Sequence, residues 1–94
     1  MYWTYIVTNK NKTVLYVGVT GNLLRRVEQH RNNAGKRATF AGRYNCYYLV
    51  YYEGFGWARD AIYREKQLKA WPRAQKLALI NTENPAWETW AAPG

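Results

Sequence analysis

The fold is decided by one stretch of sequence, Val14-Leu15-Tyr16-Val17-Gly18-Val19-Thr20 followed by Gly21-Asn22-Leu23-Leu24-Arg25-Arg26-Val27-Glu28-Gln29-His30. Its first half is rich in branched and aromatic residues, which favour an extended strand. Thr20 and Asn22 supply turn and N-cap chemistry, because a short polar side chain accepts hydrogen bonds from the first amides of a helix. The helix that follows carries Arg26 and His30 four residues apart, hence on one face. A basic face just beyond a strand end indicates a phosphate site.

Two further strand-like segments accompany this stretch. Tyr2–Thr8 precedes it, and the short polar turn between them predicts an antiparallel hairpin with residues 14–19. Within this hairpin Gly18 weakens its strand unless some group approaches the backbone closely there. Residues 46–53 are almost entirely aromatic and aliphatic, which is typical of a strand buried on both faces of a sheet, or of its central strand.

Helical patterns complete the chain. We expect helices over residues 22–33, over residues 57–70 and from Pro72 to about residue 80, with the tail held to the body by Trp87 and Trp90. The order β-β-α-β-α-α predicts an α/β fold with a small, three-stranded, mainly antiparallel sheet flanked by helices. A chain of 94 residues is long enough for one domain, which we expect to span residues 1–94.

The charge balance restricts the partners of the chain. Fourteen Lys and Arg against six Asp and Glu give a net charge of +8, which favours a polyanion, most simply nucleic acid. The alternative is a protein whose basic surface is incidental. Residues 36–45 contain Lys36, Arg37 and Arg43, which would either clamp a phosphate backbone or form a solvated loop. Most of the abundant aromatic residues belong to the core, and others are able to stack on bases.

Cysteine and hydropathy patterns bear on the cellular compartment. The single cysteine, Cys46, excludes an internal disulfide and fits a reducing compartment, so we expect a cytoplasmic protein. In its strand-like context we expect Cys46 to be a small buried side chain. The chain has no apolar run of about twenty residues and no signal-peptide pattern, so we expect no membrane partner.

One carboxylate falls on the core-facing side of the helix over residues 57–70. At about 100° per residue, Glu65 lies near the middle of the apolar stripe that includes Ala61 and Leu68. A carboxylate there is costly unless a cation or strong donors meet it. Glu65 is therefore either a structural residue, paired with an arginine or placed at the rim of the core, or a metal ligand or general acid/base. One carboxylate, together with substrate phosphate oxygens and waters, is a typical way to hold Mg²⁺.

Together these features resemble the GIY-YIG nuclease domain, and most closely its small single-domain branch. Trp3-Thr4-Tyr5 stands at the first half-motif and Tyr16-Val17-Gly18 at the second, while Arg26 and His30 match the helix pair and Glu65 matches the metal-binding acid. The resemblance covers essentially the whole chain. The chain departs from the family pattern at Trp3-Thr4, where Gly-Ile is usual, and at Val19, where longer relatives often have Lys or Ser. For the Asn that completes the family site we choose Asn84, with Asn81 as the competitor.

The resemblance implies a metal-dependent endonuclease that hydrolyses nucleic-acid phosphodiesters, with DNA the expected substrate and DNA repair a candidate pathway. It implies that Glu65 holds Mg²⁺ or Mn²⁺ and that Arg26 stabilises charge on the phosphorane. Tyr16 is then the expected base, oriented by Tyr5. His30 would relay a proton or bind the phosphate, with a pKa near the working pH.

The expected contacts to nucleic acid are Gly18, Thr20, Lys36, Arg37 and Arg43, although Thr20 and Asn22 suit helix capping better than ligand binding. Two alternatives stay open: a non-catalytic nucleic-acid-binding module of the same fold, and a protein-interaction domain. A core this small has little surface for reading bases, so we expect low sequence specificity, with structure preference or a targeting protein partner in its place.

Overall fold

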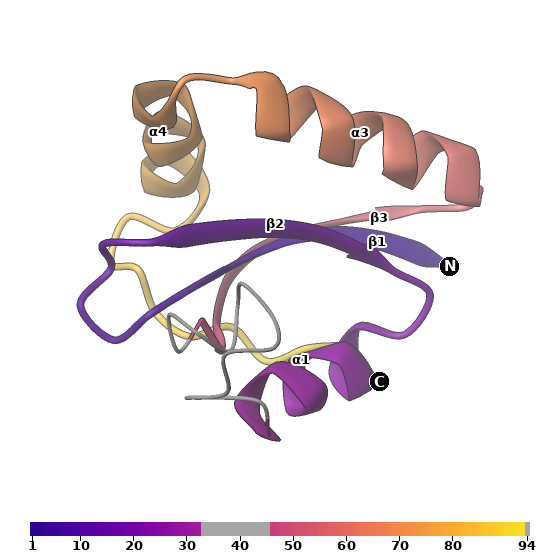
Figure 1. Cartoon of the computed structure of the whole chain (residues 1–94), viewed down its shortest axis with the longest axis horizontal. Helices are drawn as coiled ribbons and strands as arrows, with labels where there is room; N and C mark the ends of the chain where they lie inside the picture. The colour runs from indigo at the N-terminus through magenta and orange to yellow at the C-terminus, as the bar shows by residue number, and fades with distance from the viewer. Residues whose placement is uncertain (33–45, 94) are drawn as a thin grey trace.

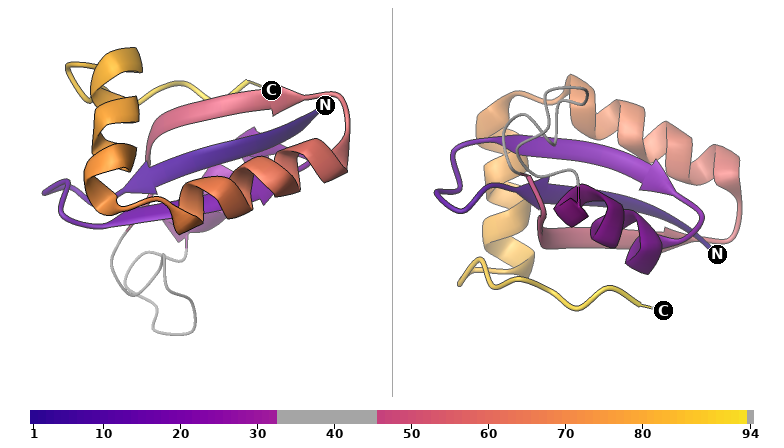
Figure 2. Two further views of the ribbon diagram at one scale, coloured as in Figure 1. Left: turned by 90° about the horizontal axis from the view of Figure 1, so that it is seen from above. Right: turned by 60° about the horizontal axis from the view of Figure 1, so that its bottom comes forward.

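The computed structural model describes residues 1–32 and 46–93, in which one antiparallel sheet is covered by helices on both faces (Figure 1). The strands are β1 (Tyr2–Thr8), β2 (Leu15–Thr20) and β3 (Tyr48–Phe55), and the helices are α1 (Leu23–Asn32), α3 (Ala58–Ala70) and α4 (Arg73–Glu83). Helix α1 lies on one face of the sheet, and α3 and α4 lie on the other (Figures 1 and 2). The predicted order β-β-α-β-α-α and the predicted fold class are confirmed.

The strand order is β2-β1-β3, so β1 is central and β3 lies at an edge. The long apolar run of β3 is therefore not the mark of a central strand. It reflects burial on both faces, since Leu49 packs with the α1 side of the core and Val50 packs with the α3 and α4 side. The C-terminal segment runs beside this edge (Figure 2), where the Trp90 amide donates to the Leu49 carbonyl at 2.7 Å.

Each face of the sheet has its own hydrophobic cluster. On the α1 side, Tyr5 and Val7 of the central strand pack with Leu23 and Val27 of the helix. On the opposite side, the core consists of buried residues from all three strands, α3 and α4: Ile6, Val17, Val50, Tyr51, Leu68 and Ile80. Trp87 and Trp90 pack against the core as the sequence predicts, with Trp90 touching both clusters.

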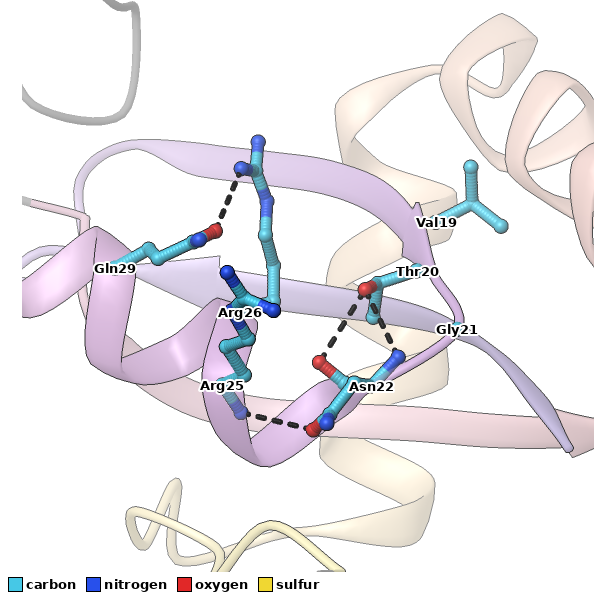
Figure 3. A pocket seen from close by; sticks show the side chains of 7 residues that line it. All are labelled: Val19, Thr20, Gly21, Asn22, Arg25, Arg26 and Gln29. Atoms are coloured by element: carbon cyan, nitrogen blue, oxygen red, sulfur yellow. Dashed lines mark hydrogen bonds between the residues drawn. The ribbon is translucent and has the colours of Figure 1, made fainter.

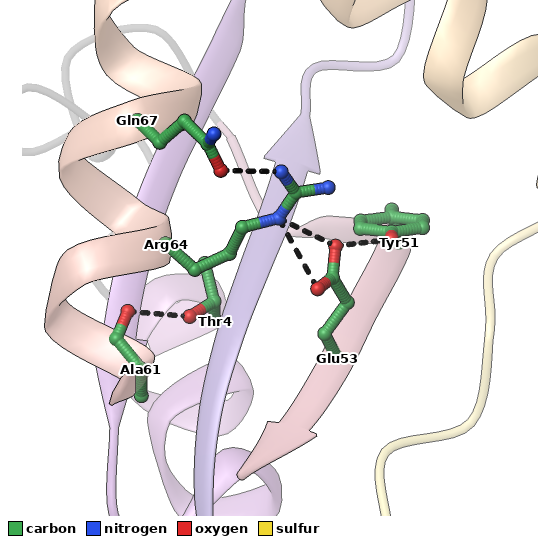
Figure 4. Close-up of polar contacts among 6 residues, drawn as sticks. All are labelled: Thr4, Tyr51, Glu53, Ala61, Arg64 and Gln67. Carbon is green, nitrogen blue, oxygen red and sulfur yellow. Dashed lines mark hydrogen bonds and ion pairs between the residues drawn. The ribbon is translucent and has the colours of Figure 1, made fainter. Parts of the chain in front are cut away.

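Helix α3 is fastened to the sheet by a polar cluster around Arg64, here called the Arg64 cluster and made of Arg64, Glu53, Tyr51 and Gln67 (Figure 4). Arg64 Nε donates to both oxygens of Glu53, at 3.0 and 3.2 Å, and Nη1 donates to Gln67 at 2.6 Å. The Tyr51 hydroxyl donates to the same carboxylate. The guanidinium also lies 5.1 Å from the ring centre of Trp71. These contacts fix how α3 is rotated about its axis.

Cys46 is buried, as expected, and burial raises the pKa of its thiol to about 11. Within residues 1–32 and 46–93 no helix is both long and apolar enough to cross a lipid bilayer.

Candidate active site

The hairpin of β1 and β2 brings the two motif tyrosines to the α1 face of the sheet. In the antiparallel register Tyr5 pairs with Gly18 and Val7 pairs with Tyr16, so the two tyrosines are diagonal neighbours on one face. Their ring centres are 6.5 Å apart. Tyr5 is fully buried, whereas Tyr16 is only partly covered.

Gly18 is a glycine because the phenol of Tyr5 lies across it. A Cβ built on Gly18 would stand 2.4 Å from the Tyr5 hydroxyl oxygen, closer than real Cβ contacts allow. The close approach that a glycine in a strand indicates is therefore made by Tyr5. The nucleic-acid contact predicted for Gly18 is not needed to explain its small size.

Helix α1 begins directly after β2 because its first residues are capped. The Asn22 side chain accepts from the Arg25 amide at 3.1 Å, and Thr20 Oγ1 accepts from the Asn22 amide at 3.1 Å. The capping role expected of Asn22 is confirmed, whereas Thr20 stabilises the turn before the helix. With the cap in place, Leu23 and Val27 face the core, and Arg26 and His30 lie beside them against the tyrosines.

Arg26, Tyr5 and His30 form a chain of hydrogen bonds. Arg26 Nε lies 3.3 Å from the Tyr5 hydroxyl oxygen, and that hydroxyl lies 2.9 Å from His30 Nε2. Because a guanidinium only donates, the Tyr5 oxygen accepts from Arg26, and the bond between Tyr5 and His30 takes its direction from the His30 tautomer. Tyr16 closes the group, with its ring centre 5.3 Å from that of His30. We call Tyr5, Tyr16, Arg26 and His30 the Arg26 cluster.

Burial sets the protonation states of this cluster. Burial raises the pKa of Tyr5 to about 12, against the lowering effect of Arg26, so Tyr5 is a neutral phenol at neutral pH. Burial, with the nearby Arg26 charge, lowers the pKa of His30 to about 4. The expectation of a His30 pKa near the working pH was wrong, because the imidazole is 5% exposed and faces a fixed cation. The hydrogen bond to Tyr5 is the main cause that raises the pKa of Arg26, which stays charged.

Glu65 lies at the rim of the core and not in the middle of the buried stripe. Ala61 and Leu68, on one flank, are fully buried, whereas Ile62, on the other flank, is 40% exposed. The Glu65 side chain keeps 15% of its surface exposed and lies 3.1 Å from Lys69 Nζ, so of the two structural interpretations the rim position holds and the pairing with an arginine does not. Its carboxylate acts on the Arg26 cluster through space, since its charge is one of the weaker causes that raise the pKa of Tyr5, after burial.

The donor set around Glu65 fits one kind of metal site. Across the described residues no three His, Cys, Asp or Glu side chains gather into a ready-made site. A single, partly exposed carboxylate oxygen donor suits a hard cation such as Mg²⁺, which keeps several waters and takes further oxygens from a phosphate. The chain's own residues therefore fit a cation that is completed by its substrate.

A pocket of about 400 Å³ opens at the start of α1 (Figure 3). The turn from Thr20 to Asn22 forms its floor, and Arg25, Arg26 and Gln29 supply side chains to it. The first turn of α1 contains no acidic residue, so its amide ends and the two arginines present one sign of charge. Arg26 belongs both to this pocket and to the Arg26 cluster, so an anion in the pocket would lie next to the tyrosines.

The GIY-YIG catalytic domain model matches residues 1–78 of this chain. The chain belongs to the GIY-YIG family. Among its relatives is a UPF0213 protein of Clostridium perfringens, 39% identical over 89% of this chain and 87% of that protein. Another is a UPF0213 protein of Natronomonas pharaonis, 33% identical over 87% of this chain and 93% of that one. A UPF0213 protein of Bacillus halodurans, solved by NMR, superposes with a TM-score of 0.58 and is 27% identical, over 95% of this chain and 93% of that chain.

GIY-YIG proteins form a nuclease family, so membership implies nuclease chemistry and a nucleic-acid substrate as a class. The names of the matched relatives state no activity, metal or target. Of the predicted site residues, the structure brings Tyr5, Tyr16, Arg26 and His30 into direct contact and places Glu65 within electrostatic range of Tyr5.

Asn84 is not joined to the Arg26 cluster by any of its contacts. It ends α4 and is buried, with its amide donating to the carbonyls of Val50 and Glu88 and its oxygen accepting from the Glu88 amide. These bonds support a structural role in this GIY-YIG chain, and a catalytic role for Asn84 stays a prediction. Asn81 is exposed and accepts from the Trp87 indole. Lys36, Arg37 and Arg43 lie outside the described residues.

Two residues of the GIY-YIG site escaped the sequence reasoning. Arg25 and Gln29 both line the α1 pocket, and Gln29 accepts from Arg26 Nη1 at 3.2 Å. The spacing of Gln29 three residues after Arg26 was a usable signal, because residues at i and i+3 of a helix are neighbours. Arg25 follows the N-cap within the first turn, where side chains border the free amides.

Proposed function

We propose that this GIY-YIG protein is a metal-dependent endonuclease that hydrolyses nucleic-acid phosphodiesters, with DNA the first substrate to test. The observation that carries the proposal is the convergence of Tyr5, Tyr16, Arg26 and His30, from three separate elements, beside a basic pocket. Side chains this far apart in sequence gather around a partly buried arginine only at a cost in desolvation, which a catalytic use explains.

Arg26 is the residue that stabilises charge in the transition state. Its guanidinium has five N–H donors, and Tyr5, Tyr16 and Gln29 engage part of them. Within residues 1–32 and 46–93 no carboxylate lies within ion-pair distance of Arg26, so its charge remains available to a phosphate in the α1 pocket. A planar guanidinium donates two parallel bonds to such an anion, which a lysine cannot imitate.

Tyr16 is the candidate base. Tyr5 is buried, and its hydroxyl is already shared between Arg26 and His30, so it suits an orienting role. Tyr16 stands at the partly exposed side of the same cluster and interacts with Arg26, so it is the phenol of the pair that water can reach. His30 acts through its hydrogen bond to Tyr5 and is a positioning residue. Glu65 would hold Mg²⁺ or Mn²⁺, which would supply Lewis-acid polarisation of the phosphate and stabilisation of the leaving oxygen.

Cleavage of supercoiled plasmid in the presence of Mg²⁺ tests this proposal. We expect Arg26→Ala, Glu65→Gln and Tyr16→Phe each to lose about 100-fold or more of the activity. Arg59→Ala is the matched control, because Arg59 is an exposed arginine that stacks 5.5 Å from the ring centre of Trp57. Undiminished cleavage by both Arg26→Ala and Glu65→Gln would overturn the site assignment.

A second candidate function is a nucleic-acid-binding module without turnover. The basic α1 pocket favours it, because the pocket is able to hold a phosphate with no help from Glu65. Under this alternative, DNA binding weakens with salt as counterions are released, and neither the wild type nor Glu65→Gln cuts. Absence of any salt-dependent binding would favour a protein-interaction domain in place of both.

A further inference from the structure

The carboxylate assigned to the metal is already occupied by a cation of the chain itself. Lys69 Nζ lies 3.1 Å from Glu65 Oε2, one helical turn away on the same face of α3. It is the ion-pair partner of Glu65 among the residues that the structure describes. In the free protein the negative charge of this rim position is therefore matched by an ammonium.

The two partners of this pair differ in mobility. The Glu65 side chain is 15% exposed and lies against the buried side of α3, whereas the Lys69 side chain is 52% exposed. A lysine on a flexible four-carbon stem leaves a partly exposed partner readily, since exposed pairs of this spacing favour the paired form by only about two-fold. Lys69 is thus able to swing away while Glu65 stays in place.

An ammonium and a divalent cation compete for one carboxylate. A metal at Glu65 would lie within a few ångströms of Lys69 Nζ, where like charges repel strongly at a partly buried site. A metal at Glu65 Oε2 would therefore displace Lys69. The displaced Lys69 ammonium is able to pair with a nucleic-acid phosphate, which is negatively charged like the Glu65 carboxylate.

We propose that Lys69 is a placeholder cation that couples metal loading at Glu65 to nucleic-acid binding. In the free protein it lowers the affinity of Glu65 for divalent ions, and a bound phosphate backbone draws it off. By linkage, the metal must then strengthen nucleic-acid binding by the same factor as nucleic acid strengthens metal binding. This inference rests on the proposed function and adds to it the control of metal access.

Mn²⁺ binding to the full chain, followed by the EPR signal of the free ion, tests the proposal without any turnover. In the absence of DNA we expect Lys69→Gln to bind Mn²⁺ about three-fold more tightly than the wild type. Lys66→Gln is the matched control, because Lys66 is an exposed lysine of the same helix with no ion pair to the described carboxylates. Its Mn²⁺ affinity should stay within about two-fold of the wild type.

The same titration with a phosphorothioate DNA duplex, which resists hydrolysis, measures the coupling. DNA should increase Mn²⁺ affinity in both proteins, and by about three-fold more in the wild type than in Lys69→Gln. Lys69→Ala, which preserves helix propensity, provides a second variant if Lys69→Gln folds poorly.

The failures of this proposal and of the proposed function are distinguishable. If Lys69→Gln binds Mn²⁺ no more tightly than Lys66→Gln, or gains as much affinity from DNA as the wild type, the placeholder role is wrong and the nuclease proposal stands. If Glu65→Gln binds Mn²⁺ as well as the wild type, Glu65 is not the metal ligand, and both proposals lose their metal site.

Discussion

Two arginines on opposite sides of the sheet have nearly the same surroundings. Arg26 on α1 and Arg64 on α3 each use Nη1 to hold a glutamine three residues later, at 3.2 and 2.6 Å. Each uses Nε to reach a side chain of the sheet, Tyr5 at 3.3 Å for Arg26 and Glu53 at 3.0 Å for Arg64. The difference is the charge of that sheet residue, a phenol in the first case and a carboxylate in the second.

This difference separates a structural arginine from a candidate catalytic one. The Arg64–Glu53 pair is neutral as a unit and also carries Tyr51, so it fastens α3 to β3 and has little attraction left for an anion. Arg26 meets a neutral phenol and a neutral imidazole, so its unit keeps a full positive charge beside an open pocket. A partly buried cation without a counter-charge is costly for stability and useful for binding phosphate.

The largest expected effect is on plasmid cleavage, which should depend on Arg26 and not on Arg64. Arg26→Gln should reduce plasmid cleavage by about 10²–10³-fold, because it removes the charge that faces the phosphorane. Arg64→Gln, an equal change of shape and charge, should leave the rate of the folded protein within about three-fold. Equal losses in the two variants would show that the arginines are not divided in this way.

Gly18→Ala should give the largest loss of stability, since it disturbs the Tyr5 ring on which the Arg26 cluster depends. A methyl group at this position would meet the Tyr5 hydroxyl at 2.4 Å, so we expect a loss of about 3 kcal/mol in urea denaturation. Gly21→Ala is the control, because its Cβ would find Tyr2 at an ordinary 3.7 Å. A change beyond about 0.5 kcal/mol for Gly21→Ala would point to backbone effects in place of the clash.

For stability the order is reversed, and replacing Arg64 should cost more unfolding free energy than replacing Arg26. Arg64→Gln leaves Glu53, which is 25% exposed, without its cation and should cost about 2 kcal/mol of unfolding free energy. Arg26→Gln removes a charge that has no counter-charge among the described residues and should cost less than about 1 kcal/mol. Thermal and urea unfolding of both variants measure the two costs, and the reverse ranking would contradict the comparison.

The smallest effect concerns the neutral partner of Arg26. The pKa of His30 is lowered to about 4 in the folded protein, so the unfolded chain takes up its proton first as pH falls below about 6.5. Stability contributed by neutral His30 is complete above pH 6.5 and should fall by about 1 kcal/mol between pH 6 and pH 5. His30→Asn should flatten this slope, and NMR titration of the imidazole should give its pKa directly. An imidazole that titrates near 6.5 would contradict the neutral cluster.

Alternation and helical periodicity predicted the element order, because both depend on neighbours in sequence. The same patterns could not place β3 at an edge, since an apolar run looks alike whether another strand or the tail covers it. Tyr5, Tyr16, Arg26 and His30 were predictable as a set from their order and spacing. The Lys69 partner of Glu65 was equally predictable from its i, i+4 spacing and was missed, whereas the pKa of His30 was not predictable, because it depends on the burial of one ring.

The glycine beneath the Tyr5 ring joins the two half-motifs into one packing unit. Because the phenol at position 5 fills the space that a side chain at position 18 would need, Gly18 is not free to change alone during evolution. A relative with alanine in place of this glycine should carry a smaller residue in place of the tyrosine, or a displaced strand. The number of residues between the half-motifs is then set by the hairpin, which must be of the length that pairs Gly18 with Tyr5.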